Sequence, residues 1–272
     1  MDYNKVVALV YKAKNIIKYL KLNPTLKNGN PNDFVTAVDI GISDFLKEEL
    51  YNEFPDVAFM TEEEKEHFLG GKTFILDPID GTTNLVYDYQ MSSISLAYVE
   101  DKQVKFGVVF NPFTNELFFG IKGQGAYLFK TNKGISSLLK TGIENYKGKP
   151  LKVSKRDLPQ SLIEFGAGSS HKDQADQNFE RAKRIFKNCL DIRRTCSTAL
   201  AICYIATGRL DGYFEKVIQP WDFAAGILIL DEAGGTSGTW SASPLPLSHT
   251  TDLICSNAII FEKLRNLVIG EN

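Results

Sequence analysis

Apolar residues recur at helical spacing near the start of the chain. Between residues 3 and 22 they share one face, with lysines on the other: Val6, Val7, Leu9, Val10, Ala13, Ile16, Ile17 and Leu20. This spacing predicts an amphipathic helix. A polar stretch from Leu26 to Pro31 predicts a loop, and a second helical pattern runs from about Ile40 to Tyr51. The chain is therefore expected to open with two helices.

Residues with β-branched and aromatic side chains dominate the middle of the chain. The run from Phe74 to Leu76 predicts a short buried strand that stops at Asp77-Pro78. Three further runs predict a meander of antiparallel strands at Ile94–Val99, Val104–Phe110 and Glu116–Phe119. A loop rich in Gly and Lys is expected at 131–150.

Strand-like and helix-like patterns alternate through the second half of the chain. The strand-like runs are Leu162–Gly166, Asp191–Arg194, Leu210–Phe214 and Leu253–Ser256. The helical runs are Ala175–Lys187, Ser197–Thr207, Trp221–Glu232 and Ile259–Val268. This alternation predicts an α/β fold. We expect an N-terminal α+β half at 1–145 and a C-terminal α/β half at 146–272.

Composition excludes several classes of partner. The 272 residues include 31 Lys and Arg against 33 Asp and Glu, so the net charge is −2. This balance disfavours nucleic acid and anionic membrane surfaces as partners. The longest apolar run, Phe223–Leu230, is far shorter than the roughly 20 residues of a membrane span. The first residues lack the apolar core of a signal peptide, so a cytoplasmic protein is expected.

The cysteines and histidines do not follow metal-binding or disulfide patterns. The four cysteines contain no CxxC pair, and the three histidines lie far apart: Cys189, Cys196, Cys203 and Cys255, with His67, His171 and His249. A zinc site or a disulfide framework is not expected.

A pair of acids marks the point where chemistry is expected. Asp77 and Asp80 flank Pro78-Ile79 and precede Gly81-Thr82-Thr83-Asn84. Free N–H groups at the start of a turn or helix attract phosphate, whereas carboxylates repel it. Divalent cations between them would remove this conflict, and oxygen ligands without His or Cys favour Mg²⁺. A short DPxD string by itself is more typical of a solvated turn.

Other acids have ordinary explanations when each is taken alone. Asp222 opens an apolar helix and resembles a helix cap, as does Asp39. The three acids Glu62, Glu63 and Glu64 resemble a solvated charge run.

Taken together, these strings resemble one family. DPIDGTTN at 77–84 and WDFAAGILILDEAGG at 221–235 are the longest, and they occur with VTAVD at 35–39, TEEE at 61–64 and GRLDGYFE at 208–215. In this order they resemble the inositol monophosphatase family of Mg²⁺-dependent phosphatases. The resemblance extends from about residue 6 to 268. It implies a layered αβαβα sandwich and commonly a homodimer.

The resemblance also implies roles for individual residues. A first Mg²⁺ would bind Glu62, Asp77 and the backbone carbonyl of Ile79. A second would bind Asp77, Asp80 and Asp222, and a third, weaker one would use Glu62 and waters. The remaining implied roles concern the substrate and the attacking water. The N–H groups of Gly81 and Thr82 would hold the substrate phosphate, and Asp222 would lie beside the substrate. Thr82 with Asp39 would orient the attacking water, and Glu215 would contact hydroxyl groups of the polyol.

Two departures from the family pattern bear on the site. Thr61 and Cys196 stand where relatives usually have Gly. We expect Cys196 and Cys203, seven residues apart, to be small core residues on one helix face.

The expected function is hydrolysis of inositol monophosphate or a related small polyol or sugar phosphate. The pair Thr83-Asn84 favours inositol phosphate hydrolysis over the related activities of this superfamily. Fructose bisphosphatase-like or nucleotide 3'-phosphatase activity and a non-catalytic regulatory role remain alternatives.

Overall fold

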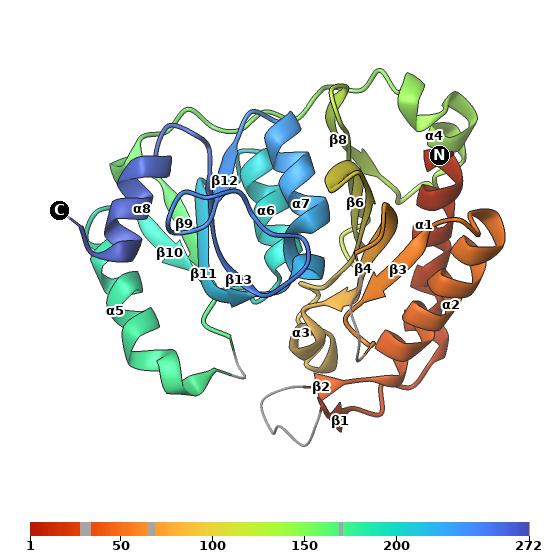
Figure 1. Cartoon of the computed structure of the whole chain (residues 1–272), viewed down its shortest axis with the longest axis horizontal. Helices are drawn as coiled ribbons and strands as arrows, with labels where there is room; N and C mark the ends of the chain where they lie inside the picture. The colour runs from red at the N-terminus through yellow and green to blue at the C-terminus, as the bar shows by residue number, and fades with distance from the viewer. Residues whose placement is uncertain (28–33, 65–68, 169–170, 272) are drawn as a thin grey trace.

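The protein is a stack of five layers, α, β, α, β and α (Figure 1). The structure is a computed structural model and describes residues 1–27, 34–64, 69–168 and 171–271. Part of the predicted polar loop at Leu26–Pro31 lies outside these ranges. Three hydrophobic cores fill the spaces between the layers. The expected layered sandwich is confirmed.

The first sheet has six strands in the order β3-β4-β5-β6-β7-β8. They are β3 (Ala58–Thr61), β4 (Lys72–Asp80), β5 (Ser93–Glu100), β6 (Gln103–Asn111), β7 (Glu116–Ile121) and β8 (Gly125–Lys130). The predicted antiparallel meander is confirmed, but the edge strand β3 runs parallel to β4. The sequence prediction missed β3 and β8. Four residues without clear alternation, as in β3, carry little strand signal.

Strand β4 is longer than predicted. It continues through Asp77-Pro78 as far as Asp80, and the register with β5 shifts between Asp77 and Asp80. Proline lacks a backbone N–H, so it is tolerated in a strand where the ladder is interrupted. The prediction that the strand stops at Asp77-Pro78 is therefore wrong, and the shift sets both acids at the end of the strand.

Two helices cover the outer face of the six-stranded sheet (Figure 1). Helix α1 (Tyr3–Tyr19) ends three residues before its predicted end, and α2 (Ala37–Glu53) begins three residues earlier than predicted. Thr36 is the N-cap of α2. Asp39 is the third residue of the helix and the partner of Thr36 in a capping box, rather than the cap itself. Between these helices lies a pair of two-residue strands, β1 (Thr25–Leu26) and β2 (Phe34–Val35).

The second sheet has five strands in the order β10-β9-β11-β13-β12. They are β9 (Leu162–Phe165), β10 (Asp191–Arg193), β11 (Gly212–Ile218), β12 (Thr236–Gly238) and β13 (Thr251–Ser256). Helices α5 (Ala175–Phe186) and α8 (Phe261–Ile269) pack on its outer side. The predicted alternation is confirmed except for β12. The predicted loop at 131–150 contains the short helix α4 (Ser136–Thr141).

The central layer consists of α6 (Thr198–Ala206) and α7 (Pro220–Glu232), which lie between the sheets (Figure 1). Both are apolar on nearly every face, as expected for helices covered on two sides. Helix α7 lies very close to the first sheet. A Cβ atom on Gly107 of β6 would come within 2.6 Å of the Ala225 carbonyl oxygen. This close packing fixes the start of α7 relative to the end of β4.

The strands of the first sheet come from residues 58–130 and those of the second from 162–256. The boundary at residue 145 stays a prediction, because α6 and α7 belong to the core shared by both sheets. No helix in the described ranges is long and apolar enough to cross a membrane.

Candidate active site

The end of β4 carries two buried acids and leads into a sharp turn. Asp77 and Asp80 are 2% and 6% exposed. The Ile79 N–H donates to Asp77 Oδ1 at 3.0 Å. Gly81 then adopts φ +90° as the cap of the short helix α3 (Thr82–Val86). A Cβ at position 81 would lie 2.9 Å from the Met91 carbonyl oxygen, so only glycine fits this turn.

Asp80 is bound by donors from the other half of the chain. Its Oδ1 accepts the Thr198 N–H at 3.0 Å, and its Oδ2 accepts the Ala199 N–H at 3.0 Å and the Ser197 hydroxyl. The Ser93 hydroxyl of β5 donates to Oδ2 at 3.3 Å. The start of α6 is thereby attached to the end of β4.

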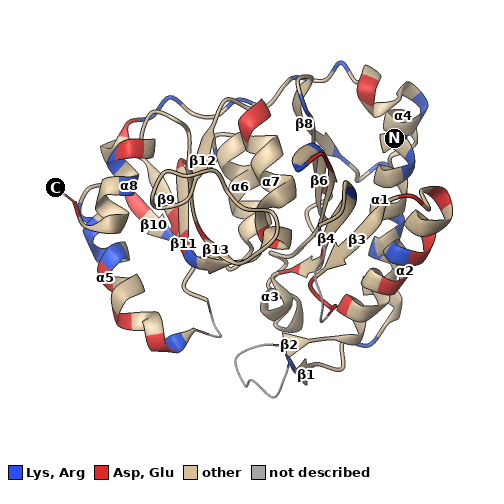
Figure 2. Cartoon of the chain, in the orientation of Figure 1, with Lys and Arg blue, Asp and Glu red and all other residues tan. Residues whose placement is uncertain are grey.

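Two more acids approach the end of β4. Asp222 belongs to the first turn of α7, where its Oδ2 accepts the Gln219 N–H at 2.8 Å in a capping box. Glu62 follows β3 directly, beside the Leu76 carbonyl of β4. Figure 2 shows acidic residues at the end of β4 and the start of α7, between the two halves of the molecule. The structure thus gathers Glu62, Asp77, Asp80 and Asp222.

The protonation equilibria of these carboxyl groups reflect their burial and mutual repulsion. Burial, with the charges of Glu62, Asp80 and Asp222, raises the pKa of Asp77 well above its ordinary value. Burial and the charge of Glu62 do the same to the pKa of Asp222. Burial raises the pKa of Asp80 to about 6 and that of Glu62 to about 7. Such a set is stabilised by an added positive charge.

The donor set fits a hard divalent cation. Carboxylates and a backbone carbonyl are the ligands that Mg²⁺ prefers. Among the described residues, no three His, Cys, Asp or Glu side chains already form a closed metal cage. The Gln219 and Ile79 N–H groups and a lysine hold carboxylate oxygens instead. A bound cation would compete with these donors for the carboxylate oxygens.

Lys27 lies beside the acidic cluster. Its Nζ donates to Glu62 Oε1 at 2.7 Å and to Glu63 Oε1 at 3.2 Å. Burial opposes the charged form of Lys27, but the two carboxylates outweigh burial and raise its pKa. Sequence reasoning missed this residue because one lysine in a polar loop carries no distinguishing signal.

The acids that follow Glu62 differ in their surroundings. Glu63 shares Lys27 with Glu62. Glu64 instead forms an ion pair with Lys47 of α2. The expectation that Glu64 is simply solvated is therefore wrong, because it is partly buried against that lysine.

Thr82 and Asp39 are in direct contact. The Thr82 hydroxyl lies 2.9 Å from Asp39 Oδ1 and 3.1 Å from the Ile79 carbonyl oxygen, and it can donate to either. Asp39 Oδ2 accepts the Thr36 N–H at 2.9 Å and the Thr36 hydroxyl. Burial raises the pKa of Asp39, although the bonds from Thr36 and Thr82 oppose the rise. The Thr82 hydroxyl is thus held at the start of α3.

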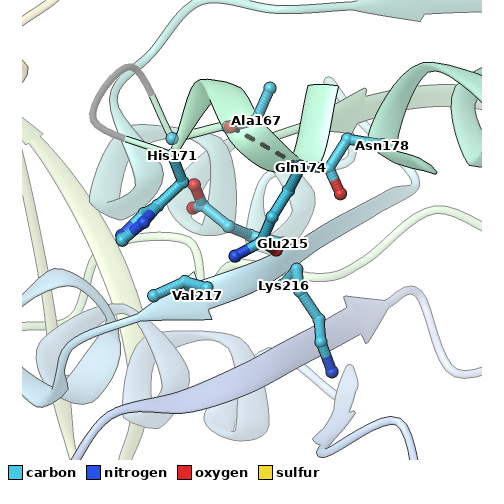
Figure 3. A pocket seen from close by; sticks show the side chains of 8 residues that line it. Ala167, His171, Gln174, Asn178, Glu215, Lys216 and Val217 are labelled. Atoms are coloured by element: carbon cyan, nitrogen blue, oxygen red, sulfur yellow. Dashed lines mark hydrogen bonds between the residues drawn. The ribbon is translucent and has the colours of Figure 1, made fainter. Parts of the chain in front are cut away.

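Glu215 of β11 faces a small pocket. Figure 3 shows its side chain directed toward His171 and Gln174, which line the pocket with it. The Tyr213 hydroxyl donates to Glu215 Oε2 at 2.6 Å, and the Thr198 hydroxyl donates at 3.3 Å. Burial raises the pKa of Glu215 to about 7. Sequence reasoning did not identify Tyr213 and Thr198, since both resemble ordinary core residues.

Thr61 and Cys196, the two departures from the family pattern, differ in backbone conformation. Thr61 is the last residue of β3, in extended backbone that suits a β-branched side chain. Cys196 precedes α6, is exposed and has φ +61°. The expectation that Cys196 and Cys203 share a helix face in the core is wrong for Cys196, and of these two cysteines Cys203 alone is buried. The left-handed backbone at Cys196 is one that glycine adopts more easily.

Comparison with known proteins places this fold among the IMPases. An IMPase of Thermotoga maritima superposes with a TM-score of 0.82 at 29% identity, over 97% of this chain and 95% of its own. A model of the inositol monophosphatase family matches residues 3–269. The chain belongs to the inositol monophosphatase family, which supports a phosphatase function and is generally metal-dependent.

Two curated relatives carry different names. Inositol monophosphatase 2 of Saccharomyces cerevisiae is 38% identical over 220 residues, which cover 76% of this chain and 69% of the relative. The Nus factor SuhB of Escherichia coli strain K12 is 35% identical over 240 residues, covering 85% of this chain and 82% of the relative.

Proposed function

We propose that this protein is a Mg²⁺-dependent phosphomonoesterase that hydrolyses inositol monophosphate or a related small polyol or sugar phosphate. The observation that carries the proposal is the cluster of Glu62, Asp77, Asp80 and Asp222 beside the Thr82–Asp39 pair. Family membership supports the phosphatase class.

The acidic cluster supplies the residues that would hold the metal. Glu62 and Asp77 with the Ile79 carbonyl would form one ion site, and Asp77, Asp80 and Asp222 would form another. Bound divalent cations supply activation of water at neutral pH and neutralisation of the charge on the phosphate oxygens.

The protein's own groups position the substrate and the attacking water. The Gly81 and Thr82 N–H groups lie where the chain turns from β4 into α3, and they would hold the phosphate. The Thr82 hydroxyl, hydrogen-bonded to Asp39, would orient the water. Glu215 would accept hydrogen bonds from hydroxyl groups of the polyol, because its carboxylate is held by Tyr213 at the edge of a pocket.

The test is phosphate release from a panel of inositol, sugar and nucleotide monophosphates and fructose bisphosphate, with and without Mg²⁺. We expect inositol or sugar monophosphates to be hydrolysed and exhaustive chelation to abolish turnover. Ca²⁺ should inhibit, because its longer and more variable bonds misplace the reacting groups. Full turnover after chelation would contradict the proposal, and nucleotides as the best substrates would favour the sister activity.

A matched pair of variants identifies the site. Asp222→Asn should abolish turnover. Asp157→Asn should leave it unchanged, since Asp157 is a surface acid paired with Lys263. Equal losses in both variants would argue against the cluster as the active site.

A regulatory role without turnover is the second candidate. The observation that favours it is the similarity to a relative named as a Nus factor. A folded protein that binds Mg²⁺ but hydrolyses nothing in the panel would support this alternative. We also propose a cytoplasmic homodimer, for which light scattering gives the mass in solution.

A further inference from the structure

A buried carboxylate outside the acidic cluster lacks an evident structural reason. Glu164 of β9 is 1% exposed. Its Oε1 accepts both the N–H and the hydroxyl of Thr195, at 2.6 and 2.5 Å. Its Oε2 is buried and has no hydrogen-bond partner among the described residues. Burying a carboxylate that is only half satisfied is costly, so a local stabilising role alone explains it poorly.

Thr195 begins a segment that contacts the candidate site at two points. The Thr195 carbonyl accepts a hydrogen bond from Asn84 Nδ2 of α3 at 2.7 Å. The same amide nitrogen donates to the Met91 carbonyl at 2.7 Å, so Asn84 is fixed on both sides. Ser197, Thr198 and Ala199 then supply three donors to Asp80. We call residues 195–199 the bridging segment.

The bridging segment has a conformation that requires support. Cys196 has φ +61° between the residue that bonds to Asn84 and the residues that bond to Asp80. A non-glycine residue in the left-handed region persists only where its surroundings hold it there. Asp80 at the end of β4 and Asn84 of α3 hold the segment on one side, and Glu164 of the second sheet holds it on the other.

We propose that Glu164 is a positioning residue that holds the bridging segment against Asp80 and Asn84 and thereby sets the metal affinity of the site. This inference rests on the proposed function and deepens it. Releasing Thr195 frees the donors that orient the Asp80 carboxylate and the amide that fixes α3. Changes to groups that orient metal ligands typically lower metal affinity about 10 to 100-fold.

The experiment measures Mg²⁺ binding by calorimetry in the absence of substrate, together with turnover as a function of Mg²⁺ concentration. Glu164→Ala removes the acceptor, and we expect binding about tenfold weaker, with kcat restored at high Mg²⁺. Glu164→Gln keeps an amide oxygen that accepts both Thr195 donors, so its affinity should stay within about twofold of wild type. Thr195→Val removes one of the two donors and should weaken binding about threefold.

Ile254→Val is the control for general destabilisation. Ile254 is fully buried in the core between the second sheet and the outer helices, which does not include the bridging segment. The Ile254→Val substitution should lower the melting temperature without changing the Mg²⁺ affinity. If Glu164→Ala does not fold, Thr195→Val and Glu164→Gln make the same comparison.

Three results would overturn the inference. The first is wild-type Mg²⁺ affinity in both Glu164→Ala and Thr195→Val, and the second is equal weakening in Ile254→Val. Equal weakening in Glu164→Gln and Glu164→Ala would also overturn it, because the charge and not the acceptor would then matter. The proposed function fails separately, if wild type binds Mg²⁺ but releases no phosphate, and the binding comparison still tests Glu164.

Discussion

Replacement of Asp77 by asparagine should stabilise the metal-free protein while removing its response to Mg²⁺. Asp77 is repelled by Glu62, Asp80 and Asp222 and lies in a buried position. The amide oxygen of asparagine can still accept the Ile79 N–H, which now donates to Asp77 Oδ1 at 3.0 Å. The substitution therefore removes one like charge and keeps that hydrogen bond.

The size of the gain follows from the raised pKa values. The pKa of Asp80 rises from 3.8 to about 6, and one pKa unit corresponds to about 1.4 kcal/mol, so ionised Asp80 costs about 3 kcal/mol at pH 8. Asp77 is less exposed, and its pKa is also raised. We expect the gain from Asp77→Asn to be of the same order, about 2 kcal/mol. At about 2.1 cal/mol/K of unfolding entropy per residue over 272 residues, this is a rise in melting temperature of about 3–4 °C.

The sign of the pH dependence follows from proton linkage. A carboxyl group whose pKa is raised in the folded state binds more protons there than in the unfolded state, so stability falls as pH rises from about 4 through the folded-state pKa values. The advantage of Asp77→Asn over wild type should therefore be smaller at pH 5 than at pH 8.

The assay is thermal unfolding in EDTA at pH 5 and pH 8, repeated with excess Mg²⁺. Asp80→Asn is the control. Charge alone would predict the same gain for it, but both Asp80 oxygens accept backbone N–H groups, so an amide nitrogen would face a donor in either orientation. We expect Asp80→Asn to destabilise. A lower melting temperature for Asp77→Asn than for wild type in EDTA at pH 8 would refute the reasoning.

The remaining predictions concern residues around the cluster. Lys27→Gln should bind Mg²⁺ more tightly by calorimetry, because the ammonium no longer competes for Glu62, and weaker binding would contradict this. Glu62→Gln should abolish turnover at any practical Mg²⁺ concentration, whereas the turnover of Glu63→Gln should be partly restored by more Mg²⁺ and that of Glu64→Gln should approach wild type. If the results for Glu62→Gln and Glu63→Gln were exchanged, the ligand assignment would move by one residue. Glu215→Gln should lower kcat/KM more for polyol phosphates than for a small aryl phosphate without hydroxyls, and equal losses would argue against its contact with the polyol.

Local patterns in the sequence determined the long helices and the central strands. The periodic apolar face of α1 and the β-branched and aromatic runs of β5 to β7 involve neighbours only a few residues away, so they can be recognised without the fold. The strings around Asp77 and Asp222 were specific enough to indicate the family, and the family match confirms this. The ligand set is a consequence of that resemblance and awaits the experiments above.

Tertiary structure decided what these patterns could not. Pro78 lies inside β4 because pairing with β5 shifts register there, and this depends on a strand that follows it in the chain. The bond between Lys27 and Glu62 and the bond between Glu164 and Thr195 join residues with no shared local pattern. The packing of α7 against the first sheet, which is very close at Gly107, sets the start of α7 beside the end of β4. Sequence spacing specifies which face of its own element a residue occupies, whereas distances between elements depend on how side chains from the whole chain fill the space between layers.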